Sequence, residues 1–258
     1  MKKNNCQIFG ILNVTPDSFS DGGKFLDEKL ALDQAQKLFD DGADFVDVGG
    51  QSTRPGSPDI PWQKEWEREE IILKTLLKTY PNKISLDTFH PETARRFFEL
   101  GGTILNDVSG FGNSCMRDIA PQFAMIIVNH FPGKTVDEVH EQKICSINQV
   151  RDELLFRKEQ LLQSGVSASA IVLDPGIGFG KTMELNWELL KFPLLVPNER
   201  VLIGHSRKRF LGEKRFEIDT NLCAARRALD MGAAFLRVHD VFEHRKLIFE
   251  HGENACHK

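Results

Sequence analysis

The sequence predicts an α/β fold, a closed (β/α)₈ barrel of parallel strands whose functional site lies at the carboxyl ends of the strands. Short apolar runs rich in β-branched residues alternate with segments of helical spacing roughly every 30 residues, as in parallel βα units. Nearly every apolar run ends in polar side chains. An open doubly wound sheet, the alternative, gathers functional groups at one switch point, whereas a closed barrel gathers all strand ends around one mouth.

The strands are expected where apolar runs are bounded by turn residues. These runs are Ile8–Val14, Phe45–Val48, Lys83–Leu86, Ile104–Leu105, Ala124–Val128, Ile171–Leu173, Val201–Ile203 and Phe235–Val238. The polar residues at their ends are Asn13, Asp47, Asp87, Asn106, Asp107, Asn129, His130, Asp174, Ser206, Arg237 and His239.

Amphipathic segments between the strands predict the helices. They are Leu30–Phe39, Glu67–Lys78, Pro91–Leu100, Arg151–Gln163, Leu185–Leu190 and Leu222–Asp230. Several are followed by a glycine, which is typical of a helix C-cap because glycine adopts the left-handed conformation without strain. These glycines are Gly42, Gly101, Gly165 and Gly232.

Composition and charge exclude several classes of protein. We expect residues 1–258 to form a single domain, since no Ser/Gly-rich linker or low-complexity tract divides them. Hydrophobic residues are 41% and charged residues 27%, which excludes a disordered or collagen-like chain. The chain has 33 Lys and Arg against 37 Asp and Glu, and its net charge of −4 disfavours nucleic acid and anionic lipid as partners.

Cysteine usage and hydropathy predict a cytoplasmic protein without membrane contact. The five cysteines are scattered and form no C-x-x-C pair, as in proteins of a reducing compartment. No apolar run approaches the roughly 18 residues of a membrane span. Asn13, Pro16 and Asp17 interrupt the first apolar stretch, so no signal peptide is expected.

Long polar loops follow the first two strands. The loop at 13–23 is compatible equally with ordinary turn chemistry and with a lid that closes on a ligand or metal. The loop at 47–56 carries Ser52, Thr53 and Arg54, a cluster able to contact an anionic substrate at a barrel mouth. The alternative is that its glycines serve only the turn and that Arg54 forms a surface ion pair.

Acidic and amide side chains end the third, fourth and sixth strands, at Asp87, Asn106 with Asp107, and Asp174. A carboxylate at a strand end can cap a helix, and this alternative stays open for Asp107. Several such groups at one mouth suit a flat heterocycle, because a carboxylate accepts two hydrogen bonds from an amino-pyrimidine edge.

The segment at 176–182 ends in Gly-Lys-Thr like a phosphate-binding P-loop. Pro175 stands where that motif needs its first glycine, and no second nucleotide-binding motif accompanies it. Lys181 and Thr182 after Gly180 also break the dinucleotide-binding pattern. Hydrolysis of nucleoside triphosphates and dinucleotide binding are therefore disfavoured.

Basic side chains end the last two strands, in the runs 205–209 and 237–240. Such runs are usually solvated faces, and an isolated histidine such as His239 is more often structural. In barrels, however, the loops after strands 7 and 8 frequently form a phosphate site. Cations at both strand ends in a chain of negative net charge therefore predict a bound phosphate or pyrophosphate.

Seven segments, in this order, resemble the dihydropteroate synthases and extend from Gly10 to Val241. They are 10–23, 47–56, 87–88, 105–110, 174–182, 204–211 and 237–241. The resemblance implies a barrel that condenses 6-hydroxymethyl-7,8-dihydropterin diphosphate with 4-aminobenzoate, giving 7,8-dihydropteroate and pyrophosphate in folate biosynthesis. It also implies Mg²⁺ as cofactor, a homodimer, and membership of a family targeted by sulfonamides.

The resemblance further implies roles for individual residues. The pterin would be held by Asp87, Asn106, Asp174 and Lys208, the diphosphate by Asn13, Arg54, Arg237 and His239, and Mg²⁺ by Asn13 and Asp21. The aminobenzoate pocket would be shaped by Phe19, Thr53, Pro55, Phe179, Ser206 and Lys208. Diphosphate would leave in a dissociative step without a covalent enzyme nucleophile, and the catalytic set would be Lys208, Asp87, Asp174, Arg237 and Asn13.

The chain departs from the family pattern at two positions. Gln51 stands where the family usually has Glu, which removes a charge near the second loop. Asn129 stands where a methionine usually packs on the pterin. These departures keep open a catalytically silent pterin-binding paralogue. A second alternative is a barrel that transfers a methyl group from methyltetrahydrofolate to a corrinoid protein, although it has no use for the Ser-Thr-Arg-Pro-Gly loop.

Overall fold

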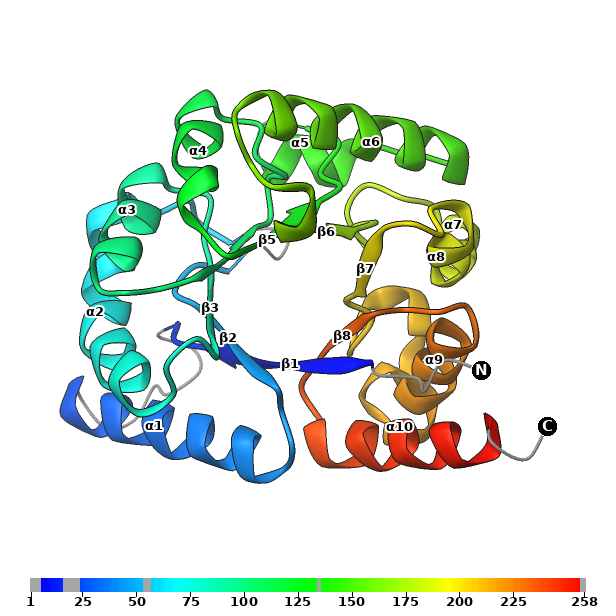
Figure 1. Cartoon of the computed structure of the whole chain (residues 1–258). Coiled ribbons are helices and arrows are strands. Elements are labelled where there is room, and N and C mark those ends of the chain that lie inside the picture. Colours follow the sequence, from blue (N-terminus) through cyan, green and yellow to red (C-terminus); the bar gives the residue numbers. More distant parts are fainter. Residues whose placement is uncertain (1–5, 16–23, 53–56, 134–135, 256–258) are drawn as a thin grey trace.

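A closed ring of strands forms the centre of the computed structural model, which describes residues 6–15, 24–52, 57–133 and 136–255. The strands β1 to β8 pair in sequence order, all in parallel, and β1 also pairs with β8. Figure 1 shows this inner ring with the helices around its outside. The predicted (β/α)₈ barrel is therefore confirmed.

The strands lie within two residues of the expected positions. They are β1 (Gln7–Asn13), β2 (Phe45–Gly49), β3 (Ile84–Asp87), β4 (Ile104–Asp107), β5 (Met125–Asn129), β6 (Ile171–Asp174), β7 (Arg200–Ile203) and β8 (Phe235–Val238). Asp87 is paired in register with Asn106, and Asn129 with Asp174. The polar side chains that end neighbouring strands therefore stand at the same height.

The helices are α1 (Lys24–Asp40), α2 (Trp62–Thr79), α3 (Pro91–Glu99), α4 (Ser114–Ile119), α5 (Val136–Glu141), α6 (Ile147–Gln163), α7 (Met183–Glu188), α8 (Phe192–Leu195), α9 (Ile218–Asp230) and α10 (Val241–Ala255). Short 3₁₀ turns lie at Ala120–Gln122, Ala168–Ala170, Leu189–Lys191, Arg209–Leu211 and Glu213–Phe216. All six expected helices are present, and α1, α2, α6 and α9 begin about one turn or more before the expected residue. The helices α4, α5, α8 and α10 lie outside the six segments named from the sequence.

The four predicted glycine C-caps are confirmed. Gly42, Gly101, Gly165 and Gly232 have φ values of 101°, 91°, 92° and 90°. At Gly101 the backbone N–H donates to the Phe98 carbonyl at 2.8 Å, and the next N–H donates to the Phe97 carbonyl at 2.9 Å. The same pair of bonds ends α1, α6 and α9, so all four helices end in Schellman motifs.

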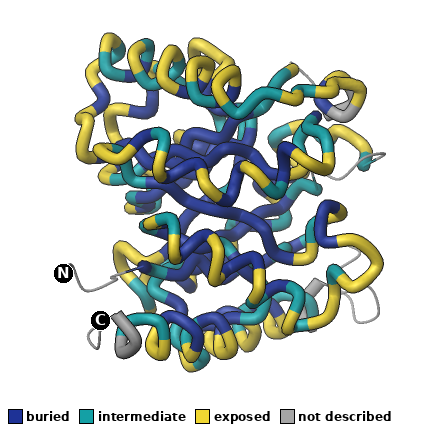
Figure 2. The backbone as a smooth tube through the Cα atoms, turned by 90° about the vertical axis from the view of Figure 1, so that its right-hand side faces the viewer, coloured by how far each residue is buried: buried dark blue, intermediate teal, exposed yellow. Residues whose placement is uncertain are grey.

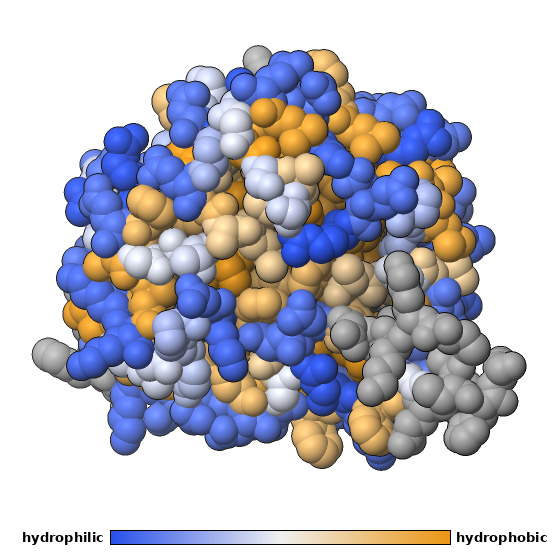
Figure 3. All heavy atoms as spheres, viewed as in Figure 1, coloured by the Kyte–Doolittle hydropathy of each residue, from blue (hydrophilic) through white to orange (hydrophobic). Residues whose placement is uncertain are grey.

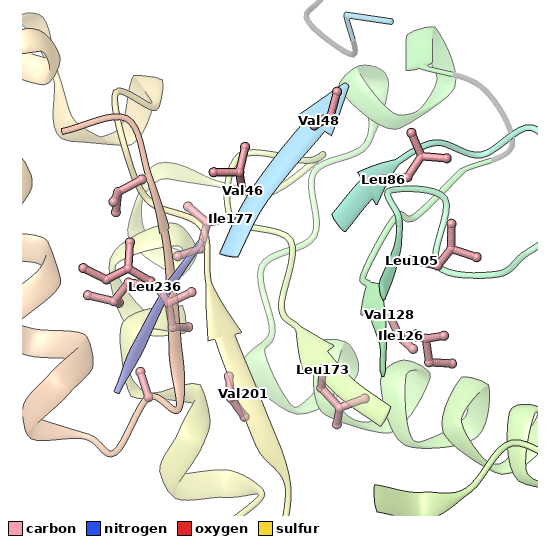
Figure 4. Packing of buried hydrophobic residues seen from close by; sticks show 14 of the residues in the cluster. Val46, Val48, Leu86, Leu105, Ile126, Val128, Leu173, Ile177, Val201 and Leu236 are labelled. Atoms are coloured by element: carbon pink, nitrogen blue, oxygen red, sulfur yellow. The ribbon is translucent and has the colours of Figure 1, made fainter. Parts of the chain in front are cut away.

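Apolar side chains fill two regions. The larger region lies between the strands and the helices and includes outward strand residues such as Leu86 and Leu173 (Figure 4). Helix residues such as Leu73 belong to the same cluster. Figure 2 shows the buried backbone inside and the exposed residues on the outer helices. Hydrophilic residues cover most of the face in Figure 3, interrupted by hydrophobic groups. No helix among the described residues is both long and apolar enough to cross a membrane.

The smaller apolar region fills the inside of the barrel. It consists of Phe9, Ile104, Ile127, Val172, Leu202 and Phe235, with Phe45 packed against it. The Phe9 ring stacks on Phe45 at 4.7 Å and meets the edge of Phe235 at 5.6 Å. This packed layer makes the barrel a solid core rather than a pore, as is usual for the fold.

Candidate active site

A layer of polar side chains stands directly above the apolar layer inside the barrel. Side chains of a strand alternate between its two faces, so a residue two positions after an inward apolar residue also points inward. This offset relates Phe45 to Asp47, Ile104 to Asn106, Ile127 to Asn129, Val172 to Asp174, and Phe235 to Arg237. One period-two pattern therefore builds both the core and the candidate site.

Arg237 is the centre of the first group of site residues. Its Nε donates to Asp47 Oδ2 at 2.6 Å, and its Nη2 donates to Asp87 Oδ2 at 2.7 Å. Asn106 also donates to Asp47 Oδ2, at 2.9 Å. The side chains of β2, β3, β4 and β8 are thus joined in one hydrogen-bonded group across the mouth.

Burial and charge oppose each other in this group. Burial acts to lower the pKa of Arg237, but the carboxylates of Asp47 and Asp87 outweigh it and raise that pKa above its ordinary value. Burial raises the pKa of Asp87 to about 7, although the Arg237 guanidinium opposes the shift. Arg237 is therefore a permanent cation, whereas Asp87 can gain a proton near neutral pH.

A second group surrounds Lys208, whose amine lies near Gly204 beside Asp174 and Arg237. Lys208 Nζ donates to the Ile177 carbonyl at 2.5 Å and lies 5.1 Å from the centre of the Phe179 ring. Asp174 Oδ1 accepts from the Gly176 N–H at 2.8 Å. Burial lowers the pKa of Lys208 to about 8 against the attraction of Asp174, and burial raises the pKa of Asp174.

The remaining residues after β7 and β8 are paired with one another. Ser206 Oγ and His239 Nδ1 are 2.9 Å apart, and Arg207 forms an ion pair with Asp240 at 2.6 Å. Arg207 has a φ of 59°, an uncommon left-handed conformation for a side chain of this size. These contacts fix the two loops against each other.

Asp107 is not a helix N-cap, which corrects the alternative left open above. It is fully buried, and its carboxylate accepts from the Ser109 N–H at 2.8 Å, the Ser109 hydroxyl at 2.7 Å and the Phe111 N–H at 2.9 Å. The next helix begins at Ser114 and is capped by Asn113. Asp107 therefore shapes the turn after β4, and burial raises its pKa to about 6.

The structure brings together most of the residues that the sequence singled out. Asp87, Asn106 and Arg237 share one group, and Asp174, Lys208 and Phe179 surround the other. Asn13 ends β1, half-buried at the mouth and paired with Gly49. Five predicted residues lie outside the described residues: Phe19, Asp21, Thr53, Arg54 and Pro55.

Buried carboxyl groups beside the site were given no role by sequence reasoning. Asp47 is 1% exposed, and the two-residue offset from Phe45 could have identified it. Glu65 and Glu69 on α2 are both fully buried, and Glu65 accepts from the Thr88 hydroxyl at 2.8 Å. Burial raises the pKa of both glutamates, and neither carries a signal in the sequence because α2 is rich in exposed acidic residues.

The two departures from the family pattern occupy defined positions. Gln51 Nε2 donates to Asp59 Oδ1 at 2.8 Å, and Gln51 Oε1 lies 3.1 Å from His90 Nε2. An ionised glutamate could not donate to Asp59. Asn129 is 8% exposed, and its Oδ1 is buried without a hydrogen-bond partner beside Gly176.

The side chains that could bind a metal ion are spread apart among the described residues. Within the part of the chain that the structure describes, no three or more His, Cys, Asp or Glu side chains are grouped so as to hold a metal ion. Asn13 contributes an amide oxygen at the mouth, which is a hard ligand of the kind that Mg²⁺ accepts. Mg²⁺ often binds through one or two protein oxygens together with the phosphates of a substrate, and Asn13 fits such a site.

Comparisons with known proteins identify a family and similar proteins. A family model described as pterin binding enzyme matches residues 9–239. The dihydropteroate synthase of Streptococcus pyogenes serotype M6 is 38% identical over 258 residues, which cover 95% of this chain and 94% of that protein.

Solved structures are similar over nearly the whole chain. The dihydropteroate synthase of Clostridium difficile, in the presence of pteroic acid, has a TM-score of 0.87 and 32% identity, covering 99% of this chain and 98% of that one. The Burkholderia cenocepacia dihydropteroate synthase complexed with 7,8-dihydropteroate has a TM-score of 0.85 and 29% identity, covering 97% and 92%.

Proposed function

The chain belongs to the dihydropteroate synthase family of pterin binding enzymes, and on this basis we propose that it condenses 6-hydroxymethyl-7,8-dihydropterin diphosphate with 4-aminobenzoate. The products are 7,8-dihydropteroate and pyrophosphate. The observation that supports this most is the ring of carboxylates, amides and cations on the strand ends, which matches both the heterocycle and the diphosphate.

The pterin is assigned to the interior of this ring. Asp174, Asn106 and Asp87 offer oxygen acceptors to the N–H groups of an amino-pyrimidine edge, and Asn106 also offers a donor. The related Burkholderia structure holds 7,8-dihydropteroate, a ligand that contains this edge. Because Arg237 already holds Asp47 and Asp87 in place, the acceptors are oriented before the ligand arrives.

The diphosphate is assigned to the rim, beside Arg237, His239, Asn13 and Arg54. Asn13 and Asp21 would hold Mg²⁺ together with the diphosphate, and the bound ion would supply positive charge that favours the leaving anion. Arg237 adds a permanent positive charge at the same side of the mouth. Lys208 has a pKa of about 8, so most of its amines are protonated at neutral pH.

In the proposed reaction the bond between the pterin methylene and the diphosphate oxygen breaks first. The bond electrons leave with the diphosphate, and the electron-rich pterin ring spreads the positive charge that remains. The amine nitrogen of 4-aminobenzoate, held beside Phe179, Ser206 and Lys208, then attacks the methylene and loses a proton. Positioning and electrostatics therefore account for catalysis without an enzyme nucleophile.

We also propose a cytoplasmic homodimer that sulfonamides inhibit, on the basis of family membership. The exposed side chains of Leu194, Phe216 and Phe249 support a dimer contact through the late elements of the barrel. Their aromatic and aliphatic character is typical of residues at protein interfaces.

The deciding experiment measures pyrophosphate release from the pterin diphosphate with and without 4-aminobenzoate and Mg²⁺. We expect release that requires Mg²⁺, yields dihydropteroate, and falls at least about a hundredfold in Lys208→Ala and Asp174→Ala. The exposed Asp118→Ala serves as the control and should retain full activity. Folded protein that binds the pterin diphosphate without forming product would show a silent paralogue instead.

A further inference from the structure

The Gly-Lys-Thr sequence that ends the loop after β6 has a lysine whose amine points into the protein. Lys181 is half-buried, and its Nζ donates to the Phe179 carbonyl at 2.8 Å and to the His130 carbonyl at 3.2 Å. His130 directly follows β5, and Phe179 lies in the loop that follows β6. One amine therefore joins the residue after β5 to the loop after β6 through backbone carbonyls.

Backbone bonds hold the same loop from its outer side. The Ile144 N–H donates to the Gly180 carbonyl at 2.8 Å, and the Thr182 N–H donates to the Ile144 carbonyl at 3.0 Å. Asn186 of α7 accepts from the Gly178 N–H at 2.7 Å. The loop is thus tied to Ile144 and to α7, and among the described residues the Lys181 side chain ties it to the end of β5.

The part of the loop that Lys181 holds faces the candidate site. The Phe179 ring lies 5.5 Å from the Phe131 ring and 5.1 Å from Lys208 Nζ. The same Lys208 amine donates to the Ile177 carbonyl at 2.5 Å. A shift of the Phe179 backbone would therefore move both the ring and the carbonyl that contact Lys208.

The charge around Lys181 fits a structural tie better than an anion site. Its two hydrogen-bond acceptors are neutral carbonyls, and it forms no ion pair among the described residues. Burial lowers the pKa of Lys181 well below its ordinary value, and the nearby Lys208 lowers it further. Two backbone carbonyls therefore accept from the buried amine, as in a structural tie.

We propose that Lys181 is a positioning residue, which fixes the Phe179 ring and the Ile177 carbonyl against Lys208 by tying the loop after β6 to the end of β5. The proposal rests on the proposed function for the identity of the substrate that packs against Phe179. It assigns Lys181 no contact with substrate or phosphate.

The first test is Lys181→Met, which keeps an unbranched stem and removes the donors. We expect the KM for 4-aminobenzoate to rise about tenfold, as for the loss of one well-placed hydrogen bond. The Kd for the pterin diphosphate should change by less than about threefold, since Asp174 and Asn106 are untouched. Lys143→Met, at an exposed lysine beside Ile144, is the matched control and should change neither constant.

A double-mutant cycle with Phe179→Ala tests whether Lys181 acts through the ring. If Lys181 acts through the ring, Lys181→Met should raise the KM for 4-aminobenzoate about tenfold in the native background. In the Phe179→Ala background the same change should raise the KM by less than about twofold. Equal effects in both backgrounds would contradict the proposal. So would a loss of thermal stability in Lys181→Met with both constants unchanged.

Hydrogen exchange without substrates separates this inference from the proposed function. In Lys181→Met we expect amides of residues 176–182 to exchange at least about tenfold faster, while amides of β1 and β2 keep their rates. Lys181→Gln, which retains an amide donor, should recover part of the protection. The exchange rates can be measured even if the chain is catalytically silent. Unchanged exchange at residues 176–182 would overturn the proposal.

Discussion

Arg237 shows how one side chain can organise a site that three other strands supply. Its planar guanidinium presents separate N–H groups to Asp47 and Asp87, which a lysine amine could not engage in the same fork geometry. The cation is therefore already paired with carboxylates before an anion arrives. If diphosphate binds beside Arg237 as proposed, it has to compete with these carboxylates, because the guanidinium is already paired with them.

Gln51 provides a prediction at the scale of single residues. We expect Gln51→Glu to lower kcat/KM about fivefold, because a carboxylate cannot donate to Asp59 and repels it across the same 2.8 Å contact. The bond joins residues on either side of the 53–56 segment, which carries three of the predicted site residues. Steady-state kinetics at neutral pH measures the effect.

The rescue for this prediction is Asp59→Asn in the Gln51→Glu background. The asparagine amide can donate to the new glutamate, so the contact re-forms with donor and acceptor exchanged. Asp59→Asn alone should change kcat/KM little, because Asp59 is exposed. If the double variant were no better than Gln51→Glu, the loss would have a cause other than this hydrogen bond.

Some residues of the candidate site could be predicted from the sequence, and others could not. Asp87, Asn106, Asp174 and Lys208 could be found because each follows an apolar strand or sits in a recognisable motif. The Arg237 contacts could not be found, because they join residues 190 and 150 positions apart that meet only when the barrel closes. Glu69 could not be found either, since only the packing of α2 shows that this glutamate is buried.

Two loops at the mouth contain glycines whose backbone lies close to the chain at the end of β5. Gly176 has a φ of 67°, and a Cβ there would lie 2.1 Å from the His130 carbonyl oxygen. Gly110 has a φ of 66°, and a Cβ there would lie 2.1 Å from the Asn129 carbonyl oxygen. At both positions a side chain is excluded by backbone atoms as well as by the left-handed conformation.

The second prediction compares Gly176→Ala with Gly101→Ala. Both positions are left-handed, but nothing lies within 4 Å of a Cβ at Gly101. Gly101→Ala should therefore lower the free energy of unfolding by about 1 kcal/mol, the conformational cost alone. Gly176→Ala should lower it by about 3 kcal/mol or more, since overpacking adds to that cost. Urea unfolding measures both, and equal losses would contradict the steric account.

At the same scale, strands were more predictable than helices. Each strand is a buried apolar run, so burial on both faces is visible in the sequence. The helices α4, α5 and α8 have six, six and four residues, too few to show a helical period. The start of α1 was placed late because the polar run Asp27-Glu28-Lys29 interrupts the apolar spacing ahead of Leu30. The segment of α10 was not among the six expected segments, although α10 contacts α9 and β1.

The stability of the whole molecule should depend on buried histidines. His205 and His244 are fully buried with their Nε2 atoms 3.3 Å apart, and His244 Nδ1 donates to the Asp240 carbonyl at 2.6 Å. Burial lowers the pKa of His205 to about 3, and burial also lowers the pKa of His244. Burial lowers the pKa of His130 to about 4, against its contact with Glu153.

The third prediction follows from these lowered pKa values. Below the ordinary histidine pKa of about 6.5 the unfolded chain binds protons that the folded chain does not, so stability falls as pH falls. His205 should contribute a slope of up to about 1.4 kcal/mol per pH unit between about pH 6 and pH 4. Urea unfolding across this range should show a shallower slope for His205→Gln than for the native chain. An unchanged slope would rule out His205 as a source of the acid sensitivity.

The four Schellman motifs lie at the end of the barrel opposite the mouth. After Gly42, Gly101 and Gly232 the next strand begins three residues later in every case, at Phe45, Ile104 and Phe235. These joints act as a fixed spacer that sets where each strand starts, and hence the height at which its last side chain enters the site. Change can therefore accumulate at the mouth without disturbing alignment, and Gln51 and Asn129, the two departures from the family, both lie there. The base of the barrel is therefore a constant support, and the loops at the mouth can change one at a time to give new specificities.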